Sequence, residues 1–325
     1  MMSEPPYARQ VPDRDRDPRQ VALTALQWPR REGHRTNEGR QTMQDLVQRL
    51  NGLCDEQPFH TGWYLKNLKT GEEADRNGQV IVPSASTRKI AILVAALKAV
   101  HEGKLALDQP VEITSKYQKT TSGVFQHFTP GFTITLRDAM VLMIIVSDNT
   151  CTGTVAEMVG LDEVNALCQS IGMTNTMHRH GVPPGDLTRD HAVDATNTTT
   201  PGDVGLLLDL LQQATRDDAV AARLGSTTAL CQLGMDILSW QKLRQRLPAM
   251  LPGTVKVAHK TGTGARNIND AGIIFASDGT TPLFILTAYT EHVPVEVPNG
   301  LPGNYAATHL IAQLSRTSWE ALREA

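Results

Sequence analysis

Residues 90–100 constrain the fold most strongly, because every residue in this segment except Lys98 is apolar. A run that is apolar on all sides predicts a helix buried on every face. Ser86 and Lys89 precede it directly, and their three-residue spacing places both side chains on one face of a helix. A buried lysine loses its proton easily and can then activate a neighbouring hydroxyl. The segment therefore predicts a buried helix that begins with a nucleophilic serine.

Two further triplets follow in order, Ser147-Asp148-Asn149 and Lys260-Thr261-Gly262. Each triplet is weak evidence alone. Together, S-x-x-K, S-D-N and K-T-G form the signature of class A β-lactamases and penicillin-binding proteins. The chain resembles this family over residues 43–325. The context of the motifs supports the resemblance, at residues 133–138, 251–264 and 269–270.

The remaining patterns predict strands near both ends of the chain and helices between them. Helices are expected at residues 42–52, over most of 104–240, and at 305–324; strands are expected at 60–68, 79–82, 271–276 and 283–290. This order favours an α+β fold. The resemblance implies the β-lactamase/transpeptidase-like form, in which helices flank an antiparallel sheet, an all-helical subdomain is added, and the active site lies between the two parts.

The expected domain division follows from the same patterns. The proline-rich and charge-rich residues 1–41 predict a disordered tail. Residues 42–85 and 231–325 form the expected α/β subdomain, and residues 86–230 form the all-α subdomain.

The resemblance implies a role for each motif residue. Ser86 is expected to be the nucleophile, Lys89 to accept its proton, and Ser147 to relay a proton to the leaving nitrogen. Asn149 is expected to bind the amide side chain of the substrate. Otherwise, Ser147-Asp148-Asn149 serves as a turn or N-cap for the next helix, and both roles can coexist.

The third motif is expected to bind the substrate carboxylate. Lys260 supplies positive charge, Thr261 and Thr263 supply hydroxyls, and Gly262 lets the strand approach the substrate. The backbone N–H groups of Ser86 and Thr263 are expected to form the oxyanion hole. Arg246 is the candidate arginine for the same carboxylate, and the alternative for it is a surface position.

The chain departs from the family in one respect. Class A β-lactamases use a loop glutamate for deacylation, but this chain has no glutamate between Glu163 and Glu291. We therefore expect a long-lived acyl-enzyme. The loop at residues 178–194 offers histidines and aspartates as replacement bases, of which Asp190 with His191 is the preferred candidate.

Composition excludes several other classes of function. A net charge of −3 and 5% aromatic residues argue against a nucleic-acid partner, and no segment reaches 18 consecutive apolar residues, which argues against a membrane span. We expect a small-molecule substrate, no cofactor and no metal; oligomeric state is left open. The absence of a secretory signal pattern predicts a cytoplasmic protein. The four cysteines are expected to be small buried residues.

Three functions remain open at this point. The first is a serine hydrolase of the class A β-lactamase type that acts on a carboxylate-bearing lactam, amide or ester. The second is an esterase or transacylase of small-molecule metabolism. The third is a non-catalytic domain that captures an acyl ligand on Ser86 as a sensor.

Overall fold

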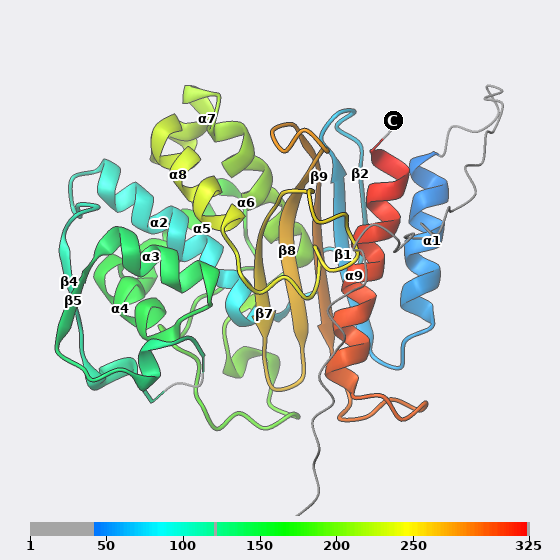
Figure 1. Cartoon of the computed structure of the whole chain (residues 1–325), viewed down its shortest axis with the longest axis horizontal. Coiled ribbons are helices and arrows are strands. Elements are labelled where there is room, and N and C mark those ends of the chain that lie inside the picture. Colours follow the sequence, from blue (N-terminus) through cyan, green and yellow to red (C-terminus); the bar gives the residue numbers. More distant parts are fainter. Residues whose placement is uncertain (1–41, 120–121, 324–325) are drawn as a thin grey trace, which may run out of the picture. The chain divides into compact units, whose positions relative to one another are not determined.

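The computed structural model describes residues 42–119 and 122–323. Its central element is an antiparallel sheet of five strands in the order β2-β1-β9-β8-β7 (Figure 1). The strands are β1 (His60–Asn67), β2 (Glu73–Arg76), β7 (Val257–Thr263), β8 (Ile268–Phe275) and β9 (Pro282–Glu291). Residues from both ends of the described chain thus share one sheet, as the α+β prediction requires.

Two hydrophobic cores cover the two faces of this sheet. On one face, α1 (Met43–Asp55) and α9 (Gly303–Leu322) pack against side chains that include Phe284 and Leu286 (Figure 1). Ile285 and Tyr289 of the same strand belong to the core of the opposite face. Because successive side chains of a strand point to opposite faces, β9 can contribute to both cores.

The helical part covers the opposite face of the sheet (Figure 1). Its helices are α2 (Lys89–His101), α3 (Leu136–Ile145), α4 (Asn149–Val159), α5 (Leu161–Ile171), α6 (Pro201–Ala214), α7 (Asp218–Arg223) and α8 (Thr228–Ser239). Each residue of α2 from Ile90 to Leu97 is buried, which confirms the predicted buried helix.

Short elements complete the fold. Two pairs of antiparallel strands are β3 (Val82–Pro83) with β6 (Thr198–Thr199), and β4 (Pro110–Ile113) with β5 (Phe132–Thr135). Single 3₁₀ turns are η1 (Ala85–Arg88), η2 (Ser115–Tyr117), η3 (Phe125–His127) and η4 (Val193–Ala195). The pair β3–β6 leads directly into η1, which carries Ser86.

The predicted strand at 79–82 is wrong for residues 79–81, and only Val82 belongs to a strand, β3. Val80 and Ile81 are exposed, at 52% and 48%, and the strand that pairs with β1 is β2, with the sequence Glu-Ala-Asp-Arg. Charged residues on an edge strand discourage pairing with other chains. Because β2 has almost no apolar residues, a search for apolar patterns does not detect it.

Further predictions concern the fold class, the cysteines, the tail and the domain division. The α+β class is confirmed, and all four cysteines are buried and unpaired, as predicted. The tail prediction concerns residues 1–41, which lie outside the described residues. The division at residues 85 and 230 stays a prediction. None of the helices in the described ranges is long and apolar enough to cross a membrane.

Candidate active site

Ser86 lies in η1, and the segment that enters this turn is held from several sides. The side-chain amides of Asn267 and Asn269 donate to the carbonyl of Pro83 at 3.1 and 3.0 Å. Ala85, next to Ser86, has a φ of +45°, a backbone conformation that is costly for a non-glycine residue. The surrounding hydrogen bonds keep the serine in this strained turn at the wall of a cleft.

Lys89 begins α2 and is 1% exposed. Its Nζ contacts the Ser147 carbonyl at 2.8 Å, the Ser147 Oγ at 3.1 Å and the Asn149 Oδ1 at 2.8 Å. No hydrogen bond joins Nζ to the Ser86 hydroxyl within the described ranges, although both residues line one cleft. The lysine is therefore placed chiefly by the second motif.

Lys260 approaches Ser147 from β7. Its Nζ lies 3.0 Å from the Ser147 Oγ and 2.8 Å from the Thr261 carbonyl. Ser147 has a φ of +58°, so its backbone is also strained. Its hydroxyl thus lies between two buried amines, as a proton relay requires.

The two amines have lowered basicity. Burial lowers the pKa of Lys260 to about 7. Burial, with the charges of Lys260 and Arg88, holds the pKa of Lys89 well below its usual range. Because the charged forms are costly in this environment, both amines lose a proton more readily than an exposed lysine does.

Asp148 has the capping role that the sequence left open for its triplet. It is the N-cap of α4, and its Oδ1 accepts from the Cys151 N–H at 3.0 Å. Its Oδ2 accepts from the N–H groups of Val124 and Phe125 at 2.7 and 2.9 Å. The capping role is thus confirmed for Asp148, and the relay role of the neighbouring Ser147 stays a prediction.

Strand β7 packs directly against the nucleophile turn. A Cβ added at Gly262 would lie 3.1 Å from the Ser84 oxygen and 3.2 Å from the Ser86 nitrogen. Thr261 and Thr263 line the cleft. The close approach expected at Gly262 is therefore present.

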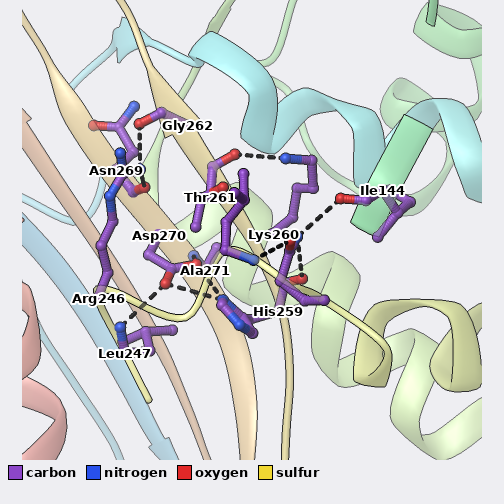
Figure 2. A network of polar contacts seen from close by, with 12 residues as sticks. Ile144, Arg246, Leu247, His259, Lys260, Thr261, Gly262, Asn269, Asp270 and Ala271 are labelled. Atoms are coloured by element: carbon purple, nitrogen blue, oxygen red, sulfur yellow. Dashed lines mark hydrogen bonds and ion pairs between the residues drawn. The ribbon is translucent and has the colours of Figure 1, made fainter. Parts of the chain in front are cut away.

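Arg246 supports this strand, and the alternative of a free surface arginine is wrong. Its Nη1 donates to the carbonyls of Gly262 at 2.7 Å and Asn269 at 2.5 Å (Figure 2). Its Nη2 contacts the Thr263 Oγ1 at 2.5 Å. The guanidinium lines the cleft beside the threonines, where it can also meet a carboxylate.

A buried pair of side chains that joins β7 to β8 was not predicted. The His259 Nδ1 lies 2.9 Å from the Asp270 Oδ1, and the Asp270 Oδ2 accepts from the Leu247 N–H at 3.1 Å (Figure 2). Both side chains are fully buried. Asp270 thus connects the segment of Arg246 to the sheet. The only sequence signal was the position of the two residues near the third motif.

The loop that follows His178 is closed by Asn197. The Asn197 Oδ1 accepts from the N–H groups of Arg179 and His180 at 2.7 and 2.9 Å. Farther along, the Arg266 Nη1 donates to the His191 carbonyl at 2.5 Å. These contacts fix the loop against the sheet, and neither Asn197 nor Arg266 was recognised in the sequence.

The two candidate bases have different positions. His191 lines the cleft, and its Nδ1 lies 2.8 Å from the Ala192 carbonyl. Asp190 is exposed and is not among the residues that line the cleft. The structure therefore brings only His191 to the reaction side of the loop.

The cleft has a volume of about 1350 Å³. It is bordered by Ser86, Lys89, Ser147, Asn149 and the loop residues Val182 and Pro183, and its far wall includes Tyr305 of α9. No aspartate or glutamate is among the described residues that line it. The described ranges also contain no cluster of histidine, cysteine, aspartate and glutamate that could hold a metal ion.

The three motifs converge on one cleft between a sheet and a helical layer, which is the arrangement of the class A β-lactamase family. A model of the β-lactamase enzyme family matches residues 45–322. The chain belongs to the β-lactamase enzyme family.

Individual relatives share less than a third of their residues with this chain. The chain is 29% identical to the β-lactamase CTX-M-25 of Escherichia coli over 254 residues, which cover 77% of this chain and 82% of the relative. It is 25% identical to the β-lactamase VEB-1 of Pseudomonas aeruginosa over 251 residues, which cover 72% and 79%.

Solved structures agree on the fold. PBP-A superposes with a TM-score of 0.73 at 26% identity and covers 87% of this chain and 97% of its own. A β-lactamase from Sphaerobacter thermophilus superposes with a TM-score of 0.70 at 25% identity, with coverage of 85% and 96%.

Proposed function

We propose that this protein forms an acyl-enzyme on Ser86 with a carboxylate-bearing lactam, amide or ester, and that it releases the acyl group slowly. The observation that carries the proposal is the placement of the Ser147 hydroxyl between the Lys89 and Lys260 amines, at 3.1 and 3.0 Å. This arrangement supports a relay for the leaving group, and the proposed base for Ser86 is Lys89, which lines the same cleft.

Acylation follows from these positions. Neutral Lys89 takes the proton of Ser86 as the serine oxygen bonds to the carbonyl carbon of the substrate. The N–H groups of Ser86 and Thr263 stabilise the oxyanion, and each such donor is worth about 3 kcal/mol of barrier. Ser147 passes a proton to the leaving nitrogen. Arg246 and Lys260 attract the carboxylate of the substrate to the threonine side of the cleft.

Deacylation is expected to be slow because no carboxylate lines the cleft among the described residues. Assistance by a general base is worth about 10²- to 10⁴-fold in rate. His191 is the better placed of the two proposed bases, since its side chain borders the cleft and Asp190 is exposed outside it. We propose that His191 supports a residual hydrolysis.

A solved relative supports the acylation half of the proposal. A variant of PBP-A was solved as an acyl-enzyme complex with penicillin G, and it superposes on this chain with a TM-score of 0.70 at 25% identity. By this likeness, penicillin G is a suitable acyl donor for a first test.

A transacylase is the second candidate, and the size of the cleft favours it. Sites for small molecules commonly measure about 300–1,000 Å³, whereas this cleft measures about 1350 Å³. The additional volume can hold an acceptor amine or alcohol beside the acyl group.

Intact-protein mass spectrometry with penicillin G and small esters tests these functions. A transient adduct with release of the free acid supports hydrolysis, and transfer to an added amine or alcohol supports the transacylase. A permanent adduct with every acyl donor favours the sensor. The absence of any adduct on the wild-type protein contradicts the proposal.

A further inference from the structure

Arg88 lies two residues after the nucleophile and is 3% exposed. Its Nη2 donates to the carbonyl of Gly181 in the loop, 93 residues away. Its Nη1 is buried and has no hydrogen-bond partner among the described residues. Arg88 borders the cleft together with Ser86, Lys89 and Val182. Arg88 therefore combines a donor that has no partner with a position at the border of the reaction cleft.

The charge of Arg88 is not compensated. No carboxylate forms an ion pair with it within the described residues. Burial lowers its pKa to about 10, without an opposing acidic group. The nearby His178 carries no negative charge, and both of its ring nitrogens are buried without a partner in the described ranges. A buried, unpaired cation is unfavourable by itself, and a bound anion removes this cost.

We propose that Arg88 forms a carboxylate-binding site in the floor of the cleft, beside Ser86 and Lys89. The planar fork of a guanidinium matches a carboxylate. The described loop residues that line the cleft provide no acid of their own; they are Val182, Pro183, Pro184, Gly185, Leu187 and His191. The carboxylate therefore comes from outside the chain, either as a free small carboxylate or as a group on the acyl part of the substrate.

The bound carboxylate has a use in deacylation, and this part of the proposal rests on the acyl-enzyme proposed above. It takes a proton from a water molecule whose oxygen bonds to the acyl carbon. The bond from that carbon to the Ser86 Oγ then breaks, and the proton passes to this oxygen. The carboxylate is regenerated, and the product is the free acid.

Thermal unfolding tests the binding site without any acyl donor. Formate should raise the Tm of the wild-type protein by about 2 °C or more over chloride at the same ionic strength. Arg88→Met should have a higher Tm in chloride, because it removes the unpaired charge, and it should lose this part of the response to formate. Lys119→Gln is the matched control, since it removes a different cation of the cleft and should keep the response that depends on Arg88. An equal response to formate in the wild-type protein and Arg88→Met would overturn the binding site.

The lifetime of the acyl-enzyme tests the use of the site. With penicillin G, formate should speed the loss of the adduct in a saturable manner, by about tenfold or more, in the wild-type protein and not in Arg88→Met. Lys119→Gln changes another cation of the cleft and should keep the acceleration. Carbenicillin, which carries a second carboxylate on its acyl side chain, distinguishes the sources: fast loss without formate indicates the substrate, and fast loss only with formate indicates a free carboxylate.

The two measurements separate the possible failures. If neither carboxylate speeds the loss of the adduct, the role in deacylation is overturned even where the Tm shift is present. If penicillin G forms no adduct, the proposed function fails, and the Tm comparison still decides whether Arg88 binds a carboxylate.

Discussion

Lys260 and Ser147 are 113 residues apart in the chain, and the lysine Nζ contacts the serine Oγ at 3.0 Å. The contact joins strand β7 to the segment that begins α4 and so joins the sheet to the helical layer. Lys89 contacts the same oxygen from α2 at 3.1 Å. The Ser147 hydroxyl is therefore the point at which residues of all three motifs meet.

The pKa of Lys260 predicts a falling rate of acylation as pH rises. Burial lowers this pKa to about 7, so the side chain is an ammonium below that pH and neutral above it. Because the ammonium attracts the substrate carboxylate, the second-order rate constant for acylation by penicillin G should fall as pH rises through about 7. Lys260→Arg keeps its charge, and it should move this fall to higher pH. A wild-type rate that stays constant between about pH 6 and 8 would contradict the assignment.

Gly262→Ala should reduce acylation much more than stability. The new Cβ would lie 3.2 Å from the Ser86 nitrogen, so the strand or the nucleophile turn must move. A displacement of this kind can cost about 10²-fold in rate, while stability should change by less than about 2 kcal/mol. Gly253→Ala is the control, because a Cβ there meets nothing within 4 Å. Equal acylation rates in the two variants would show that the close approach is unimportant.

Asp148→Ala should destabilise the whole protein. The fully buried carboxylate accepts from three N–H groups, those of Val124, Phe125 and Cys151. Its removal leaves them unpaired, at a cost of about 3–5 kcal/mol in the free energy of unfolding, measured by urea unfolding. Asp148→Asn keeps one acceptor oxygen and should lose less. If the alanine variant unfolds at the wild-type urea concentration, this capping account is wrong.

His191→Ala should lengthen the lifetime of the penicilloyl adduct by about 10-fold or more if the ring is the residual base. The matched variant Asp190→Ala should leave this lifetime unchanged, because Asp190 is exposed outside the cleft. Both variants should acylate at the wild-type rate. An unchanged lifetime in His191→Ala removes this residue from the mechanism.

The sequence predicted the elements whose burial leaves a clear pattern. Helix α2 was predicted because its apolar residues face in all directions. A strand was also predicted at 283–290, and in the structure the alternate residues of β9 enter two cores. Strand β2 was missed because its edge position favours charged residues. Val80 and Ile81 gave a false strand, since nothing in an apolar run tells whether a partner strand lies beside it.

The motif residues of the site could be predicted, but their supporting contacts could not. The contact of Arg88 with the Gly181 carbonyl and that of Arg266 with the His191 carbonyl use backbone acceptors. Because every residue has a backbone carbonyl, the residue types do not show which carbonyl accepts such a hydrogen bond. The pair of His259 and Asp270 depends on the register between β7 and β8, because this register brings the two side chains together.

Stopped-flow hydrolysis of nitrocefin measures both the activation of Ser86 and the lifetime of its acyl-enzyme. We expect a burst of about one product per active site, lost in Ser86→Ala, followed by a slow phase. The burst would show that Ser86 is activated, and the slow phase would show that the acyl-enzyme lacks a carboxylate base. No burst, or steady turnover with a kcat in the ordinary enzyme range of about 1–10³ s⁻¹, would contradict it.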